Sequence, residues 1–130
     1  MPDKTEVSAK CDVKNIFDKS LTDRIQDAML KTIQTTVNKA TDFKFVAKTS
    51  KGFMLTATVQ SLTKKDSPAQ LEVKIAISAL YIGGTAQAFN ASANGKVTAT
   101  DNDSAEDLVS QVLEGVMKNV IKTMRDLMKP

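Results

Sequence analysis

The chain has 130 residues, 42% hydrophobic and 25% charged, which is typical of one folded domain spanning residues 1–130. It has no histidine and one cysteine, which excludes His-based catalytic triads, histidine metal sites and an intrachain disulfide. The net charge of +3 comes mainly from lysine, and Arg24 and Arg125 are the two arginines, so the arginine-rich surface typical of base and phosphate readout is missing.

The first 40 residues predict a strand followed by an amphipathic helix. Apolar and polar side chains alternate from Thr5 to Val13, as in a half-buried strand. Cys11 falls on the apolar side, so we predict a structural thiol and not a nucleophile. Ser20 is the predicted N-cap of a helix that extends to Ala40. Its apolar stripe consists of Leu21, Ile25, Ala28, Met29, Ile33, Val37 and Ala40.

Residues 43–60 predict a β-hairpin. Both halves alternate apolar and polar side chains, and a three-residue loop Ser50-Lys51-Gly52 would place Phe45 opposite Ala57. That loop requires a left-handed backbone at Gly52, which glycine adopts easily. Residues 63–68 then predict a solvated loop, because Pro68 cannot join a central strand.

Residues 71–100 predict the hairpin at the centre of the sheet, turning at Gly83-Gly84. A three-residue loop would place Ile77 opposite Phe89, so that the apolar sides of both strands coincide. The alternative is a turn at Asn94-Gly95, which would divide the second strand. We favour the unbroken strand, with a bulge at Gly95 as one variant.

The last segment predicts a long helix, capped by Asp103 or Ser104 and ending near Met128. Acidic residues at its start and basic residues at its end complement the helix dipole. Residues 101–104 partly resemble a calcium loop but lack its central glycine and final glutamate, so we favour a capping turn. The buried stripe comprises Leu108, Val109, Val112, Leu113, Val116, Met117, Val120, Ile121 and Met124.

Together these elements predict an α+β fold in the order strand, helix, four strands, helix. We expect a single, mostly antiparallel sheet of about five strands, with both helices packed on one face. The even-numbered strand positions are mainly polar and would form the open face. An apolar group interrupts them: Ala76, Leu80, Ile82, Ala86 and Ala88. It predicts either a contact surface or a hairpin tip folded back on the sheet.

The order of elements resembles that of small bacterial envelope domains. These are the N-terminal domain of TolB and the related domain of curli-secretion and penicillin-binding-protein-activator lipoproteins. The resemblance rests on the helix Ser20–Ala40 leading into Phe43-Lys44-Phe45-Val46, two long strands, and the closing helix Ala105–Met128. It implies a non-catalytic module that assembles with itself or docks on a larger protein. It transfers no functional residue, and Cys11 lies inside a predicted strand, unlike a lipid-anchor cysteine.

Three functions compete at this point. The leading hypothesis is a non-enzymatic protein-interaction or assembly module, with another protein or a homo-oligomer as partner and no cofactor or metal. The second is an apolar small-molecule or lipid-binding module, suggested by Met117, Met124 and Met128. The third is a nucleic-acid or membrane-surface binder that uses basic loops, for which the lysine-dominated charge is poor support. Its candidate residues are Lys48, Lys51, Lys64 and Lys65.

The sequence predicts neither a membrane-spanning helix nor a signal peptide. No apolar run approaches the roughly 20 residues of a membrane-spanning helix. Met1-Pro2-Asp3-Lys4 does not begin a signal peptide. We expect a periplasmic or envelope location if an export signal has been removed, and a cytoplasmic one otherwise.

Overall fold

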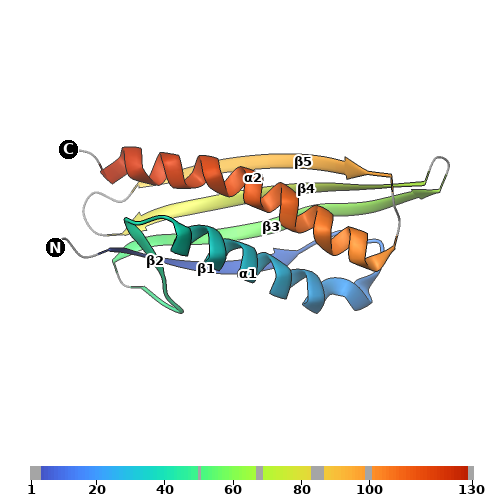
Figure 1. The fold of residues 1–130 in the computed structure, drawn as a ribbon, viewed down its shortest axis with the longest axis horizontal. Coiled ribbons are helices and arrows are strands. Elements are labelled where there is room, and N and C mark those ends of the chain that lie inside the picture. The colour runs from blue at the N-terminus through green and yellow to red at the C-terminus, as the bar shows by residue number, and fades with distance from the viewer. Residues whose placement is uncertain (1–3, 50, 67–68, 83–86, 99–100, 129–130) are drawn as a thin grey trace.

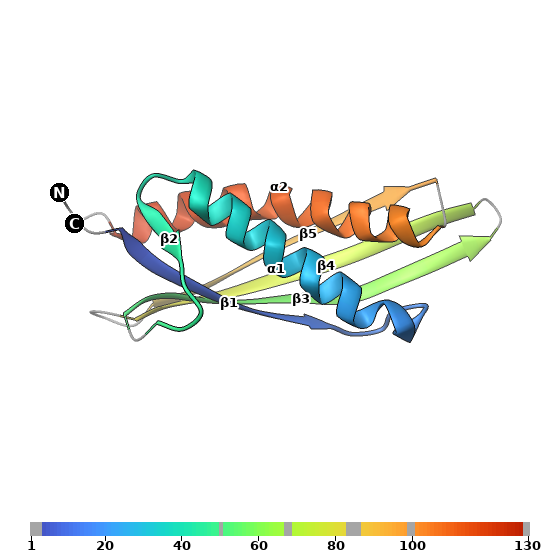
Figure 2. The ribbon, with the colours of Figure 1, turned by 60° about the horizontal axis from the view of Figure 1, so that its bottom comes forward.

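The structure is a computed structural model that describes residues 4–49, 51–66, 69–82, 87–98 and 101–128. It is an α+β fold in which two helices pack on one face of a five-stranded sheet, and the predicted fold class is confirmed (Figures 1 and 2). The strands are β1 (Thr5–Val13), β2 (Phe43–Phe45), β3 (Gly52–Asp66), β4 (Ala69–Ile82) and β5 (Gln87–Val97); the helices are α1 (Thr22–Lys39) and α2 (Asn102–Met128).

The sheet is mixed, with the strand order β2-β1-β3-β4-β5. β1 runs parallel to both of its neighbours, whereas β3, β4 and β5 form antiparallel pairs. The predicted hairpin between residues 43 and 60 is therefore wrong, because β1 lies between its two halves. Val7 of β1 is opposite both Phe45 and Phe53. The helix between β1 and β2 allows the parallel connection that a tight turn cannot make.

Gly52 has the positive φ that the sequence predicts, 130°, but the cause is not a hairpin turn. A Cβ atom at this position would overlap the backbone carbonyl of Glu6 in β1. Glycine therefore allows β1 and β3 to approach each other where β3 begins.

The β4–β5 hairpin keeps the predicted faces but differs in register. Ile77 lies opposite Ala91 and not opposite Phe89, a shift of two residues that leaves the apolar sides together. β5 continues unbroken and without a bulge through Asn94-Gly95. The preferred unbroken strand is thus confirmed, while Gly83-Gly84 lies outside the described residues.

The bulge in the sheet occurs in β3, between Val59 and Ser61. It changes which side chains face the helices, so that Leu62 is fully buried. Asn15 donates its side-chain amide to the Gln60 carbonyl at 3.1 Å and fixes the chain there. After the bulge β3 continues to Asp66, so residues 63–66 of the predicted loop are strand; Ser67 and Pro68 lie outside the described residues.

Both helices bury the stripes that the sequence predicts. Every residue of the first stripe is buried, and so is every residue of the second stripe except half-buried Val112. The predicted caps are wrong, because aspartates preceding them accept the backbone bonds. Asp18 accepts from Ser20 N–H at 3.0 Å, ahead of a short 3-10 turn, and Asp101 accepts from Ser104 N–H at 2.8 Å.

The beginning and the end of the described chain meet at one end of the molecule. The Thr5 hydroxyl in β1 donates to the Met128 sulfur in α2 at 3.2 Å. The start of β1 and the end of α2 therefore lie side by side (Figures 1 and 2). Neither described helix is sufficiently long and apolar to cross a membrane.

Candidate functional site

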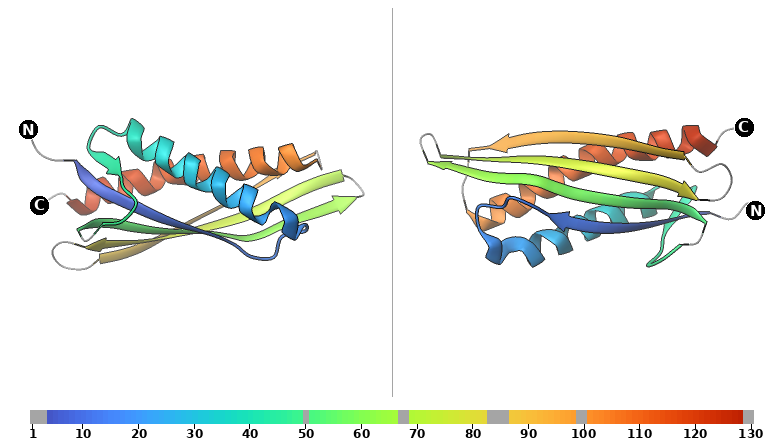
Figure 3. Two further views of the ribbon diagram at one scale, coloured as in Figure 1. Left: turned by 90° about the horizontal axis from the view of Figure 1, so that it is seen from below. Right: turned by 180° about the vertical axis from the view of Figure 1, so that it is seen from behind.

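The face of the sheet opposite the helices is open to solvent (Figure 3, right). Most of its exposed side chains are polar, as predicted: Lys10, Thr56, Ser78, Asn90, Ser92 and Asn94. One cross-strand row differs. Met54 of β3 lies opposite Leu80 of β4, which lies opposite Ala88 of β5. Met54 is 44% exposed and Leu80 is 41% exposed, although both are large apolar residues. We call these three residues the apolar row.

The structure places the predicted apolar group only partly in this row. Leu80 and Ala88 belong to it, and half-buried Ile82 lies next to Leu80 on the same face of β4. Ala76 is half-buried and lies two rows away, beyond Ser78. Ala86 lies outside the described residues. β4 pairs with β3 as far as Ile82, opposite Gly52, so this part of the hairpin is not folded back on the sheet.

Met54 is the functional candidate that the sequence reasoning missed. The alternation of residues 53–59 already placed it on the even-numbered, open face. Its neighbours Thr56 and Thr58 made that face look uniformly polar. The information lacking was the register, because only the pairing of β3 with β4 brings Met54 opposite Leu80.

A basic cleft of about 410 Å³ adjoins the apolar row at the end where β1 and β3 begin. Its lining comprises Lys4, Thr5, Glu6, Lys44, Lys51, Gly52, Tyr81 and Ile82. The Glu6 carboxylate accepts a hydrogen bond from the Thr49 hydroxyl at 2.9 Å and lies 3.9 Å from the Lys44 ammonium group. Three lysines thus face one carboxylate, and the cleft has an excess of positive charge. Ile82 connects it to the apolar row.

The four lysines of the predicted basic surface are not brought together. Lys51 lines the basic cleft, and Lys48 lies three residues before it in the segment that precedes β3. Lys64 and Lys65 are strand residues near the other end of β3, opposite Leu71 and Gln70. Their charges are dispersed over opposite ends of the sheet, so a continuous basic surface is not formed by these residues.

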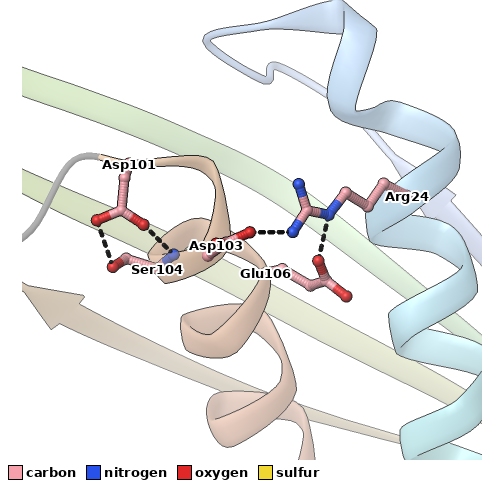
Figure 4. A network of polar contacts seen from close by, with 5 residues as sticks. All are labelled: Arg24, Asp101, Asp103, Ser104 and Glu106. Carbon is pink, nitrogen blue, oxygen red and sulfur yellow. Dashed lines mark hydrogen bonds and ion pairs between the residues drawn. The ribbon is translucent and has the colours of Figure 1, made fainter.

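Both arginines make ion pairs within the molecule. Arg24 of α1 donates to Asp103 and Glu106 at the start of α2 (Figure 4). Arg125 near the end of α2 donates through Nε and Nη2 to the Asp42 carboxylate, at 2.9 Å for the shortest contacts. The Arg24 pairs join the two helices, and the Arg125 pair joins α2 to the loop before β2. The hydrogen bonds from Arg125 hold the pKa of Asp42 below its usual range. The guanidinium groups are therefore engaged in structural contacts.

The capping turn before α2 explains the aspartates of residues 101–104. Asp101 accepts hydrogen bonds from the backbone and hydroxyl of Ser104, at 2.8 and 2.9 Å, which lower its pKa (Figure 4). Among the described residues, no three acidic or cysteine side chains form a group that could hold a metal ion. The turn thus has the structural role that the sequence favours.

The methionines of α2 belong mainly to the packed core. Met117 and Met124 are fully buried, and Met128 is half-buried beside β1. Neither Met117 nor Met124 lines the basic cleft or the cleft between α1 and α2. Their arrangement does not favour the predicted apolar-ligand site.

Cys11 lies on the helix side of β1 and is half-buried against the core. Burial raises the pKa of its thiol to about 11. We therefore expect the native protein to react with a thiol reagent at pH 8 at least ~10-fold more slowly than the urea-unfolded protein. Absorbance at 412 nm with Ellman's reagent measures both rates. Equal rates would show that the thiol is accessible and ionised in the native state.

No protein-family model matches the sequence, and no curated protein matches it significantly. Solved structures do match. PelC from Paraburkholderia phytofirmans, crystallised as a dodecamer, aligns with a TM-score of 0.58 and 10% identity over 90% of this chain and 89% of its own. A candidate lipoprotein from Caulobacter crescentus gives 0.57 and 8% over 95% and 93%. A DUF330 protein from Xanthomonas campestris gives 0.52 and 12% over 92% and 82%.

At these identities the comparisons establish the fold alone. The chain shares a fold with bacterial proteins that include a candidate lipoprotein and a DUF330 protein. The predicted resemblance is therefore supported as a likeness of fold to bacterial proteins of this kind. The finer resemblance to TolB, curli-secretion and penicillin-binding-protein-activator domains stays a prediction.

Proposed function

We propose that this chain is a non-enzymatic protein-interaction and assembly module of the bacterial envelope. The observation that carries the proposal is the apolar row on the open face of the sheet. Two large apolar side chains, Met54 and Leu80, face solvent directly opposite each other on otherwise polar strands. When a partner covers these two side chains, the free energy of the complex falls by about 25 cal/mol per Å² of apolar area removed from water.

The neighbouring basic cleft defines the chemistry of the partner. A side chain that covers Leu80 and Ile82 lies next to Lys44 and Lys51 at the cleft. The best partner is therefore a protein surface with a central apolar side chain and acidic residues beside it. The apolar contact would supply most of the affinity, and the charges would supply orientation and association rate.

The comparisons support an assembly role in this setting. PelC, which has the same fold, was crystallised as a dodecamer, and the candidate lipoprotein has the same fold. We propose that this chain likewise acts in the envelope by associating with itself or with another protein. The lack of histidine and the raised pKa of the single thiol support the non-enzymatic part of the proposal.

The apolar row can be tested with Leu80→Asp. We expect the association of the protein, with itself or with a partner in extracts of its source, to weaken at least ~10-fold, because the substitution puts a charge where an apolar contact forms. Analytical ultracentrifugation measures self-association. Cross-linking in extract measures capture of a partner. Circular dichroism and thermal melting should remain unchanged, because the side chain is 41% exposed.

The matched control is Ser78→Asp, on the same face of the same strand, one row away. Ser78 is exposed and makes one hydrogen bond to Asn90 at 2.9 Å. We expect this variant to associate like the original protein. Equal losses in the two variants, or no loss in Leu80→Asp, would contradict a role for the apolar row.

A further inference from the structure

β5 forms one long edge of the sheet. It is 11 residues long and pairs with β4 without a bulge. In the described part of the chain, β4 is its only strand partner. Natural edge strands are commonly shortened, bulged, charged or interrupted by proline to prevent pairing with other chains. β5 has none of these features except one charged residue, Lys96.

The opposite edge is treated differently. β2 there has three residues and covers only Thr5–Val7 of β1. The Lys14 N–H donates to the Val59 carbonyl in β3. Because backbone groups alternate in direction along a strand, the odd-numbered residues of β1 direct their N–H and C=O groups away from β3, towards the edge. Side chains form hydrogen bonds with two of these edge groups. The Gln26 amide donates to the Cys11 carbonyl at 3.3 Å, and the Asp12 carboxylate accepts from the Val13 N–H at 2.9 Å.

The two edges therefore differ in kind. The β1 edge is closed by β2, by a side chain of α1 and by the charged residues Lys10, Asp12 and Lys14. The β5 edge carries a regular row of small and amide side chains, including Asn90, Ser92 and Asn94, all exposed. One edge is protected and the other is suited to accept a strand.

We propose that β5 is a homodimerisation edge, where β5 of a second copy pairs antiparallel around a two-fold axis at Ser92. This inference rests on the proposed assembly function and adds a second contact surface, at which the partner is another copy of the chain. Residue 92 is the midpoint of Gln87–Val97, so this register pairs all 11 residues of each strand. The two sheets become one continuous sheet, and every contact away from the two-fold axis occurs twice.

Side-chain complementarity supports this register on both faces. On the open face, Lys96 lies opposite Ala88 of the second copy, so no charge in the strand meets a like charge. A parallel pairing in register would instead place Lys96 opposite itself. On the helix face, half-exposed Phe89 lies opposite Gly95 of the second copy. An aromatic ring covers a cross-strand glycine well.

The helix provides the rest of the contact for that ring. A Cβ built on Gly95 would lie 2.5 Å from Cγ2 of Val112, so Val112 of α2 covers Gly95 directly. Val112 is half-buried, whereas the other members of the predicted α2 stripe are buried. In the proposed dimer, Phe89 of each copy packs beside Gly95 and Val112 of the other, and both half-exposed apolar side chains become buried.

The two-fold axis gives a direct test with Ser92→Lys and Ser92→Glu. Each substitution places two like charges opposite each other, and we expect the dimer dissociation constant to rise about 5-fold or more at low salt. An equimolar mixture of the two variants should form dimers again, because opposite charges then meet. Sedimentation equilibrium measures all three samples. The loss should decrease in 0.5 M salt, where exposed charges are screened.

Asn94→Lys is the matched control on the same strand and face. In this register it meets Asn90 of the second copy, so dimers should persist. A monomeric wild-type protein at all concentrations, or a mixture of the Ser92 variants that stays monomeric, would overturn the dimer. If Leu80→Asp abolishes association while the Ser92 variants do not, the edge proposal fails and the proposed function stands. If Leu80→Asp has no effect while the Ser92 variants behave as expected, the apolar row fails instead.

Discussion

Replacing Phe53 with alanine should lower the free energy of unfolding by about 3–5 kcal/mol. Phe53 is fully buried at the start of β3. Its ring stacks on Tyr81 with a centroid distance of 4.5 Å and meets the edge of Phe43 at 6.2 Å. Truncation removes these contacts and leaves a cavity that β1, β3 and β4 cannot collapse to fill. Urea unfolding followed by circular dichroism measures the change.

The next residue provides the control. Met54 follows Phe53 on the same strand but points to the open face and is 44% exposed. We expect Met54→Ala to change stability by less than ~1 kcal/mol. A similar loss in both variants would mean that the alternation of faces in β3 is incorrect.

Gly52→Ala is the second variant with a large expected effect, a loss of about 2–4 kcal/mol. The backbone φ of 130° is strained for any residue with a Cβ atom, and that atom would overlap the Glu6 carbonyl. Relief requires β1 and β3 to separate, which breaks a parallel pairing in the middle of the sheet. Thermal and urea unfolding would both report the loss.

Gly115→Ala is the matched control for that variant and should have the opposite sign. Gly115 lies in α2, is exposed, and a Cβ atom there would meet nothing within 4 Å. Alanine should increase stability by about 0.5–1 kcal/mol, since it restricts the unfolded chain and favours a helix. A loss of stability in this variant would contradict the open position of Gly115.

The helices were predictable from the sequence because their signal is local. A residue and those three or four positions later lie on one side of a helix, so the stripe of α1 identifies the buried face without knowledge of the rest. The faces of the strands were predictable for a similar reason. Phe53, Leu55 and Ala57 alternate along β3 and are all buried, whereas Met54 and Thr56 between them are exposed.

The arrangement of the strands was not predictable in this way, because it depends on pairings between distant segments. Adjacent strands β2 and β3 suggested a hairpin, yet β1 inserts between them. The bulge at Gln60 leaves no clear mark in the sequence pattern. The pairing of β4 with β5 differs by two residues from the predicted one, and both registers place the same side chains on the buried face. The caps were wrong by two or three residues because Asp, Ser and Asn are all good caps, and several occur together in both turns.

The candidate site was predictable where it depends on the alternation of faces, and not where it depends on strand pairing. The sequence identified Leu80 as an apolar residue on a polar face, which depends only on alternation. It missed Met54, and it left open whether the four lysines act together, because both points depend on register and strand order. Their separation along β3 follows from the length of that strand, 15 residues.

The contact between Thr5 and Met128 brings the start of β1 and the end of α2 together. A short linker could join the start of β1 to the end of α2, and the chain could then be opened at another surface turn with the same neighbours in space. Circular permutants of this kind are compatible with the architecture, and they would separate the order of synthesis from the order in which the sheet assembles. The contact also means that labels placed near Thr5 and near Met128 report on the same end of the molecule.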